Sequence, residues 1–166
     1  MATSETDRDI IYTYLEEVKD PEVPVLSVLD LGIVRDIILK DDEIEVMITP
    51  TYSGCPAMDM IALQIRMSLL SRGYKNVKIT QVLSPAWTTD WMSEEGKRKL
   101  KEYGIAPPNP KQQVCSQELF APHESVQCPR CNSYHTQRIS EFGSTACKAL
   151  YQCLDCKEPF DYFRCH

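Results

Sequence analysis

The sequence predicts an α+β protein: a small mixed sheet with helices on one face, followed by a small β module held together by a metal ion. Three observations lead to this class. Residues 31–40, 43–49 and 76–82 are rich in β-branched residues or alternate polar with apolar ones, as half-buried strands do. Apolar residues recur at helical spacing in 6–19 and again after residue 55. Two Cys-x-x-Cys pairs near the end of the chain have the spacing of metal ligands.

The chain is expected to begin with a helix from about Thr6 to Lys19, whose apolar face holds Ile10, Ile11, Tyr14, Leu15 and Val18. The segment Asp20–Pro24 ends this helix, because a proline disfavours helix in the residue before it. Two strands follow, 31–40 and 43–49. The Asp41-Asp42 turn between them makes the pair a hairpin.

The stretch from Thr49 to Pro56 joins this hairpin to the next helix. Gly54 permits a backbone turn that other residues resist, and Pro56 suits a first helical turn, so Cys55 is expected at a helix N-terminus. The free N–H groups and the dipole there favour an anion, and we therefore expect the Cys55 thiol to ionise more readily than a free thiol. A thiolate in this position is a nucleophile or a ligand for a soft metal. The predicted apolar face of the helix comprises Met58, Ile61, Ala62, Ile65 and Leu69.

This helix is expected to stop near Gly73, and strand 76–82 leads to a loop that carries both tryptophans, Trp87 and Trp91. The two rings either cover the open edge or end of the sheet or form a partner-binding surface, since tryptophans often anchor protein interfaces. A charged, largely solvated helix is then expected from Ser93 to Tyr103.

Composition suggests two domains. Residues 1–105 form the α+β domain, 106–126 a polar linker stiffened by prolines, and 127–166 the metal module. The net charge of −6 comes with no compensating basic face, so no nucleic-acid partner is expected. No apolar stretch is long enough to span a membrane, and Met1–Asp9 lacks the features of a secretory signal. We therefore expect no membrane partner and a cytoplasmic location.

The metal module contains the pairs Cys128/Cys131 and Cys153/Cys156, separated by 21 residues. This spacing matches a four-cysteine zinc site, in which two tight turns bring their thiolates face to face. We therefore expect a structural Zn²⁺ in a zinc-ribbon-like fold. Asn132, after the first pair, tolerates the left-handed conformation that such turns often need, whereas Lys157, after the second, tolerates it less well.

Two further thiols, Cys147 and Cys165, lie close enough in sequence to compete for the metal. Cys147 with Cys153, or a pairing with Cys165, would instead build an iron–sulfur site. The alternative is that Cys147 and Cys165 are small buried hydrophobic residues. For His135 and His166 an ordinary polar role is favoured over metal ligation.

Three short motifs resemble the signature of a known family. Asp20-Pro21-Glu22, Asp30–Val34 and Thr51–Pro56 are similar to those of the small cytosolic iron–sulfur assembly factor domain, the SufT-like family, over about residues 8–85. Longer segments, namely 50–56, 85–91, 140–151 and 158–163, resemble the family of D subunits of the bacterial phenylacetyl-CoA epoxidase system.

The second resemblance implies an accessory role in aerobic phenylacetate catabolism, a route of aromatic compound degradation. Its members are thought to assist assembly or maintenance of iron or iron–sulfur centres in the oxygenase or reductase, and the expected partners are the other epoxidase subunits. The chain contains neither the Glu-x-x-His pairs of a di-iron bundle nor a Gly-x-Gly-x-x-Gly loop, so it is not expected to be the enzyme itself. The alternative is a non-catalytic docking subunit that moves no metal.

The resemblance also assigns a role to the first cysteine. It implies that Cys55 handles iron or a cluster transiently, with Asp20 and Glu22 near it; Glu22 is equally well explained as a turn residue. A single thiolate cannot hold a cluster, so a client, exogenous thiols or a homodimer pairing two copies of Cys55 would have to complete the coordination. No histidine precedes His123, which weakens Cys–His catalysis and favours metal handling.

Overall fold

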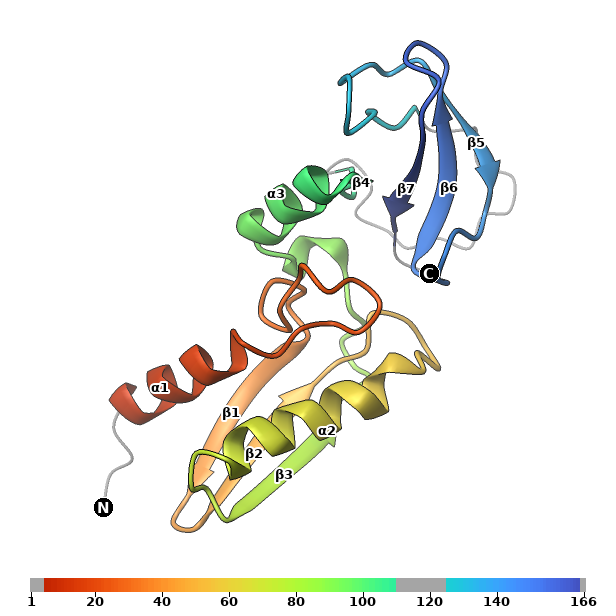
Figure 1. The fold of residues 1–166 in the computed structure, drawn as a ribbon. Helices are drawn as coiled ribbons and strands as arrows, with labels where there is room; N and C mark the ends of the chain where they lie inside the picture. Colours follow the sequence, from red (N-terminus) through yellow and green to blue (C-terminus); the bar gives the residue numbers. More distant parts are fainter. Residues whose placement is uncertain (1–4, 110–124, 165–166) are drawn as a thin grey trace. The chain divides into compact units, whose positions relative to one another are not determined.

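The computed structural model describes residues 5–109 and 125–164, which fall into two compact units (Figure 1). The first unit runs up to Trp87 and includes Trp91–Ser93. The second comprises Thr88–Asp90 and the chain from Glu94 onward. Each unit has a sheet of its own.

The first unit is the predicted α+β layer. Along the chain it contains α1 (Glu5–Leu15), β1 (Val34–Lys40), β2 (Glu43–Ile48), α2 (Ala57–Leu70) and β3 (Asn76–Gln81). The sheet order is β1-β2-β3, with β1 antiparallel and β3 parallel to β2, so the sheet is mixed. Figure 1 shows α2 running along the strands on the helix-covered face. The fold class predicted from the sequence is confirmed.

The core of this unit lies between the sheet and its helices. Its fully buried side chains include Ile11, Leu15, Leu26, Leu31, Ile33, Ile37, Ile48, Ile61, Ile65 and Leu69. Helix α1 ends at Leu15 rather than at Lys19, because the chain tightens into turns that lead to a β-bridge between Lys19 and Ser27. Ile10, predicted for the buried face of this helix, is 40% exposed.

The turn from Asp30 to Gly32 holds the tryptophan loop. Gly32 has a φ of 68°, and a Cβ there would stand 2.1 Å from the carbonyl oxygen of Trp91, so only glycine fits. Asp30 accepts two hydrogen bonds from Ser93, one from the backbone N–H to its carbonyl oxygen (2.9 Å) and one from the hydroxyl to its carboxylate (3.1 Å). The segment from Asp30 to Gly32 therefore fixes the loop that carries Trp91 and Ser93 within the first unit.

The second unit is a β module with one helix. A 3₁₀ helix (Thr89–Trp91), whose last residue belongs to the first unit, precedes α3 (Glu94–Tyr103), β4 (Ile105–Ala106), β5 (Thr136–Ser140), β6 (Lys148–Cys153) and β7 (Pro159–Phe163). Strands β5, β6 and β7 form an antiparallel meander, and β4 pairs parallel with β7. The sheet order is β4-β7-β6-β5.

The compact units differ from the sequence-based domains in one respect. Helix α3 and strand β4 belong to the second unit, and β4 lies beside Asp161 and Tyr162 of β7, whereas the sequence assigned residues 1–105 to the first domain. Residues 110–124, most of the predicted linker, lie outside the described residues. The domain limits 1–105, 106–126 and 127–166 stay a prediction.

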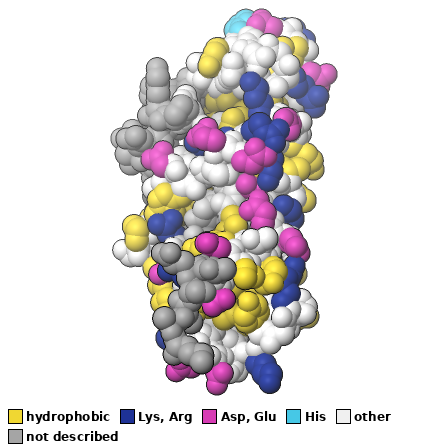
Figure 2. All heavy atoms as spheres, turned by 90° about the vertical axis from the view of Figure 1, so that its left-hand side faces the viewer, with side chains coloured by type: hydrophobic (Ala, Val, Ile, Leu, Met, Phe, Trp, Pro, Cys, Tyr) yellow, Lys and Arg dark blue, Asp and Glu magenta, His cyan; other side chains and the backbone are white. Residues whose placement is uncertain are grey.

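Charges are mixed on the face of the molecule shown in Figure 2. Acidic and basic side chains are interspersed there, with hydrophobic ones between them. The described part of this face has no broad basic surface of the kind that binds nucleic-acid phosphates. Among the helices that the structure describes, none combines the length and apolar character needed to cross a membrane.

Glu45 connects the three strands on the sheet face opposite the helices. Its carboxylate accepts a hydrogen bond from the Thr80 hydroxyl at 2.6 Å and pairs with Lys78 at 3.2 Å and Lys40 at 3.3 Å. These contacts lower the pKa of Glu45 from 4.5 to about 2, and the Thr80 hydroxyl has the largest effect. The ionised carboxylate is therefore favoured by folding.

We expect Glu45→Gln to lower stability at neutral pH, because the charge meets its partners only in the folded chain. A carboxyl whose pKa falls on folding contributes stability above its unfolded value of 4.5, and this contribution is lost as the pH falls toward about 2. Urea unfolding at a series of pH values should show the midpoints of parent and variant converging on acidification.

Glu43→Gln is the matched control for this experiment. It removes a longer ion pair with Lys40, 3.7 Å between partly exposed groups, and should shift the midpoint less than Glu45→Gln does. A gap between parent and E45Q that stays constant on acidification would contradict the assignment.

Candidate functional site

Four cysteine thiols converge in the second unit. Cys128 and Cys131 lie on a turn before β5; Cys153 ends β6, and Cys156 lies on the turn that leads from it to β7. Their sulfur atoms are all within 4.8 Å of one another, with 3.8 Å between Cys128 and Cys156 and 3.5 Å between Cys131 and Cys153. Metal–sulfur bonds of about 2.3 Å at tetrahedral angles need sulfurs about 3.8 Å apart. The four thiols therefore fit a single four-coordinate ion such as Zn²⁺, whose role there would be structural.

The two turns repeat the same backbone design. In the first, the N–H of Cys128 donates to the carbonyl of Ser133 at 2.8 Å; in the second, the N–H of Cys153 donates to the carbonyl of Glu158 at 3.0 Å. Each turn ends with a left-handed residue, although lysine was expected to resist this conformation. The two φ values are 62° for Asn132 and 67° for Lys157.

Backbone N–H groups of these turns donate hydrogen bonds to the sulfurs. Those of Cys156 and Asp155 act on Cys153, and the first of them does most to lower the pKa of the Cys153 thiol to about 7. Cys131 receives the N–H of Ser133 in the corresponding way. The pKa of Cys131 is nevertheless raised and that of Cys156 is raised to about 12, so the thiolate is favoured at Cys153 but not at these two cysteines before an ion binds.

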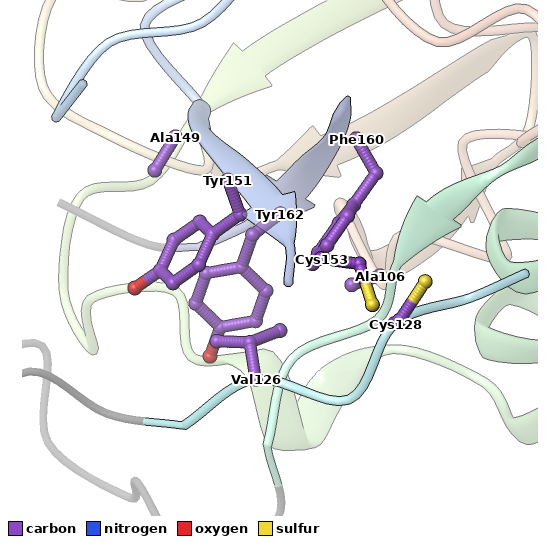
Figure 3. Packing of buried hydrophobic residues seen from close by; sticks show 8 residues of the cluster. All are labelled: Ala106, Val126, Cys128, Ala149, Tyr151, Cys153, Phe160 and Tyr162. Atoms are coloured by element: carbon purple, nitrogen blue, oxygen red, sulfur yellow. The ribbon is translucent and has the colours of Figure 1, made fainter. Parts of the chain in front are cut away.

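A small buried cluster supports the metal end of the sheet. It comprises Ala106, Val126, Cys128, Ala149, Tyr151, Cys153, Phe160 and Tyr162. In Figure 3 the sulfurs of Cys128 and Cys153 lie close together at one end of the cluster. The ring of Tyr151 stacks on Phe160 at 5.9 Å and meets Tyr162 edge-on at 5.6 Å. So few apolar side chains make a weak core, and a bound ion would contribute much of the stability.

Cys147 is not brought into this thiol cluster. It precedes β6 whereas Cys153 ends that strand, and six extended residues span about 20 Å. The two thiols therefore cannot share an ion or a cluster, and the iron–sulfur alternative through this pair fails. Cys147 is buried, with its sulfur 3.0 Å from the Thr145 hydroxyl, as a small hydrophobic residue would be. Cys165 lies outside the described residues.

His135 lies beside the metal end of the sheet but does not belong to the four-sulfur group. Its Nδ1 is 3.0 Å from a carboxylate oxygen of Asp155, and the carboxylate also accepts a hydrogen bond from Ser133. This polar link between the two cysteine turns was not foreseen from the sequence. His166 lies outside the described residues.

Cys55 lies directly before α2, as predicted. The preceding Gly54 has a φ of 74°, and Pro56 occupies the cap position of the helix with a φ of −67°. The carbonyl oxygen of Cys55 accepts a hydrogen bond from the N–H of Met58 at 3.2 Å. The thiol is half-buried, and it is reached by the hydroxyl of Tyr52 and by the N–H of Ala57.

The expectation of an easily ionised Cys55 thiol was wrong. Burial raises the pKa of Cys55 above its ordinary value and is the largest effect; the carboxylates of Glu22 and Asp20 raise it further. The Tyr52 hydroxyl and the Ala57 N–H act in the opposite direction but do not prevail. The helix N-terminus therefore favours the thiolate as predicted, yet it is outweighed by desolvation and by the negative charges of Glu22 and Asp20.

The structure brings Asp20 and Glu22 near Cys55, but the two differ in their local roles. Asp20 is buried, and its Oδ1 accepts hydrogen bonds from the N–H groups of Glu22 at 2.7 Å and Val23 at 2.8 Å, so it builds the turn. Glu22 acts more strongly than Asp20 on the Cys55 thiol. The contact of the Tyr52 hydroxyl with the Cys55 thiol was not predicted from the sequence. The position of this tyrosine, three residues before the cysteine, is the feature that could have indicated it.

The two tryptophans differ in exposure. Trp87 is buried, and its indole N–H donates to the carbonyl of Leu31 at 2.8 Å. Trp91 is partly exposed, with the guanidinium of Arg35 3.5 Å from its ring centre. These contacts favour the interpretation that the rings close the end of the first unit, and a partner-binding role stays a proposal.

Comparisons with family models match two segments of the chain. Residues 8–80 match the family described as iron-sulfur cluster assembly protein, and residues 112–164 match the PaaD zinc beta ribbon domain. The first segment contains Cys55, Asp20 and Glu22. The second contains all four clustered cysteines.

Individual relatives agree with these segments. The chain is 49% identical over 155 residues to a candidate D subunit of the 1,2-phenylacetyl-CoA epoxidase of Escherichia coli, covering 93% of this chain and 91% of the relative. It is 40% identical over 98 residues to an Fe-S protein maturation auxiliary factor of Porphyromonas gingivalis, covering 58% and 91%. Among solved structures, a DUF59 domain of unknown function from Bacillus anthracis aligns with a TM-score of 0.55 and 26% identity, covering 59% of this chain and 94% of that one.

We expect Cys153→Ser to abolish metal binding, because a tetrahedral ion loses one of four ligands and the turn loses its thiolate. Metal analysis of the purified chain should give about one ion per parent chain and little for the variant, together with unfolding of the second unit. Cys147→Ser is the control and should keep the ion. Equal metal content in C153S and the parent would rule out the four-cysteine site.

We expect the Cys55 thiol to react with iodoacetamide only at higher pH than an ordinary cysteine, because the thiolate is the reactive form and the pKa of Cys55 is raised. Labelling at this residue, measured by mass spectrometry across pH, should move to lower pH in Glu22→Gln, which removes a nearby negative charge. Glu16→Gln is the control. Glu16 is an exposed carboxylate that does not act on Cys55, so its removal should leave the labelling profile unchanged. A parent profile at or below that of the unfolded chain would refute the raised pKa.

Proposed function

The chain belongs to the family of the D subunits of 1,2-phenylacetyl-CoA epoxidase, as its motifs led us to expect, and from this premise we propose that it helps assemble or maintain the iron or iron–sulfur centres of that enzyme system. The family models and relatives point to an assembly or maturation factor rather than a catalytic enzyme. The clients would be the oxygenase or reductase subunits. A cytoplasmic location, where thiols stay reduced, is part of the same proposal.

One observation carries this proposal: a half-buried thiol, Cys55, lies near the carboxylates of Glu22 and Asp20, and burial together with these charges raises its pKa. A cation entering this loop would be attracted by the carboxylates and would in turn lower the pKa of the thiol. The thiol therefore becomes a ligand only when a metal arrives. Such conditional ligation suits transient handling of iron better than permanent storage.

The four-cysteine ion has a different proposed role. A closed set of four thiolates leaves no position for a substrate, so the Zn²⁺ proposed there stabilises the second unit and takes no part in transfer. Cys128, Cys131, Cys153 and Cys156 are its proposed ligands. The iron or cluster handled at Cys55 is cargo.

A docking subunit that moves no metal is the second candidate. It is supported by exposed apolar side chains on the second unit, where Tyr134, Ile139 and Phe142 are 53 to 61% exposed. Under this alternative the chain would bind the epoxidase through these side chains, with Trp91 as a further proposed contact, and Cys55 would be dispensable.

Replacing Cys55 with Ser separates the two candidates. We expect co-expressed oxygenase and reductase subunits to lose iron to the level reached without this chain, because serine is a poor ligand for iron. Iron per client subunit is the measurement, and Cys147→Ser is the control, since it removes a buried thiol elsewhere. Undiminished client iron with C55S would exclude the transfer role. A double variant, Ile139→Glu with Phe142→Glu, tests docking: loss of complex formation while client iron stays intact would favour the docking subunit.

A further inference from the structure

Helix α2 has two apolar faces. One is buried in the first unit and comprises Met58, Ile61, Ile65 and Leu69. The other comprises Met60, Leu63, Met67 and Leu70, whose side chains are 49, 53, 58 and 39% exposed. We name these four residues the α2 stripe. Among the residues that the structure describes, only the first of these faces is covered, so the second is available to a partner surface.

The spacing of the α2 stripe is that of a helix–helix seam. Its members follow one another by three, four and three residues, which are the intervals of the first and fourth positions of a heptad. Side chains at these intervals form one straight row that interdigitates with a second row of the same kind. The unbranched methionine side chains of the row adapt readily to such packing.

We propose that the α2 stripe is the interface of a homodimer, in which the stripes of two copies pack side by side with their helices parallel. A two-fold axis brings the same surface of both copies together, so the surface must complement itself. A single row of methionine and leucine satisfies this condition, because each side chain meets its own counterpart.

The charges beside the stripe determine the direction of the second helix. Asp59 and Arg66 flank the row on one side and Gln64 and Ser71 on the other. In a parallel pair, Asp59 of one copy faces Gln64 of the second, and Arg66 faces Ser71, so no like charges meet. In an antiparallel pair with the rows aligned, the two copies of Arg66 face each other near the centre. Electrostatic repulsion therefore disfavours the antiparallel arrangement.

The parallel direction has a consequence for the Cys55 loop, and this consequence rests on the proposed function. One residue, Pro56, separates Cys55 from α2, so a parallel pair brings both Cys55 loops to the same end of the interface. An antiparallel pair would place them beyond opposite ends of a 14-residue helix, more than about 21 Å apart. The second copy would supply a further thiol and further carboxylates to cargo that one Cys55 cannot hold.

Leu63→Glu tests the interface. The stripe is smaller than a standard interface, so we expect a reversible, concentration-dependent dimer of the parent chain in analytical ultracentrifugation. Two glutamates facing each other in one apolar layer should weaken dimerisation at least about tenfold. Leu83→Glu changes a leucine that is 69% exposed elsewhere in the first unit and should dimerise like the parent. A parent that stays monomeric, or a dimer unaffected by L63E, would overturn the proposal.

Met60→Cys tests the direction. In a parallel pair two copies of residue 60 adjoin, and mild oxidation should give a disulfide-linked dimer through this position, located by mass spectrometry. In an antiparallel pair residue 60 lies opposite residue 70, about 15 Å from its counterpart, and no such link forms. Dimers without a 60–60 link would overturn the parallel arrangement.

These measurements use the purified chain alone, so they stand apart from the transfer of iron to clients. If L63E is monomeric but clients still acquire iron, the dimer stands and its role in holding cargo fails. If C55S abolishes client iron while the parent is monomeric, the proposed function stands and the dimer fails.

Discussion

The carbonyl oxygen of Trp91 occupies the space that any side chain at residue 32 would need. A Cβ on Gly32 would stand 2.1 Å from that oxygen, and its φ of 68° already disfavours other residues. This close approach lets Asp30 bind Ser93 twice. The residue after the glycine, Ile33, accepts a hydrogen bond from the N–H of Thr49 at 2.9 Å, where the Cys55 stretch begins. One glycine thus fixes both the loop that closes the first unit and the start of the loop that carries its reactive thiol.

Local and tertiary effects compete at Cys55. The sequence predicts the local effects, namely a turn at Gly54 and a helix start directly after Cys55; Pro56 lies at the cap, one position before the first turn expected for it. The tertiary effects come from burial and from Glu22 and Asp20, which are more than 30 residues away along the chain. They prevail because desolvation penalises a thiolate more than a few partial charges favour it. Hydrophobic periodicity and helix-cap residues could not predict that the pKa of Cys55 is raised rather than lowered.

The distinction between local and tertiary effects also explains how much of the fold could be predicted from the sequence. The core face of α2 and the β1–β2 hairpin follow from spacing within single segments or across one short turn, and both were predicted. The pairing of β4 with β7 depends on residues more than 50 positions apart, and residues 105–106 carry no local strand signal. Lys157 adopts its left-handed conformation because the thiol turn as a whole requires it, against the preference of lysine. The second apolar face of α2 was hidden from the sequence, since an apolar helix alone does not say which face is covered.

The two thiol sites differ in completeness, and completeness determines what each can do. Four sulfurs within 4.8 Å would fill every position of a tetrahedral ion, so releasing that ion would require breaking metal–sulfur bonds with no free position for an incoming ligand. Cys55 offers one sulfur, held protonated beside carboxylates, and any ion bound there keeps positions open for another molecule. A site that accepts and releases cargo has to be incomplete within one chain. Incompleteness at Cys55 is therefore a requirement of the transfer role, and a second copy or a client would supply what is missing.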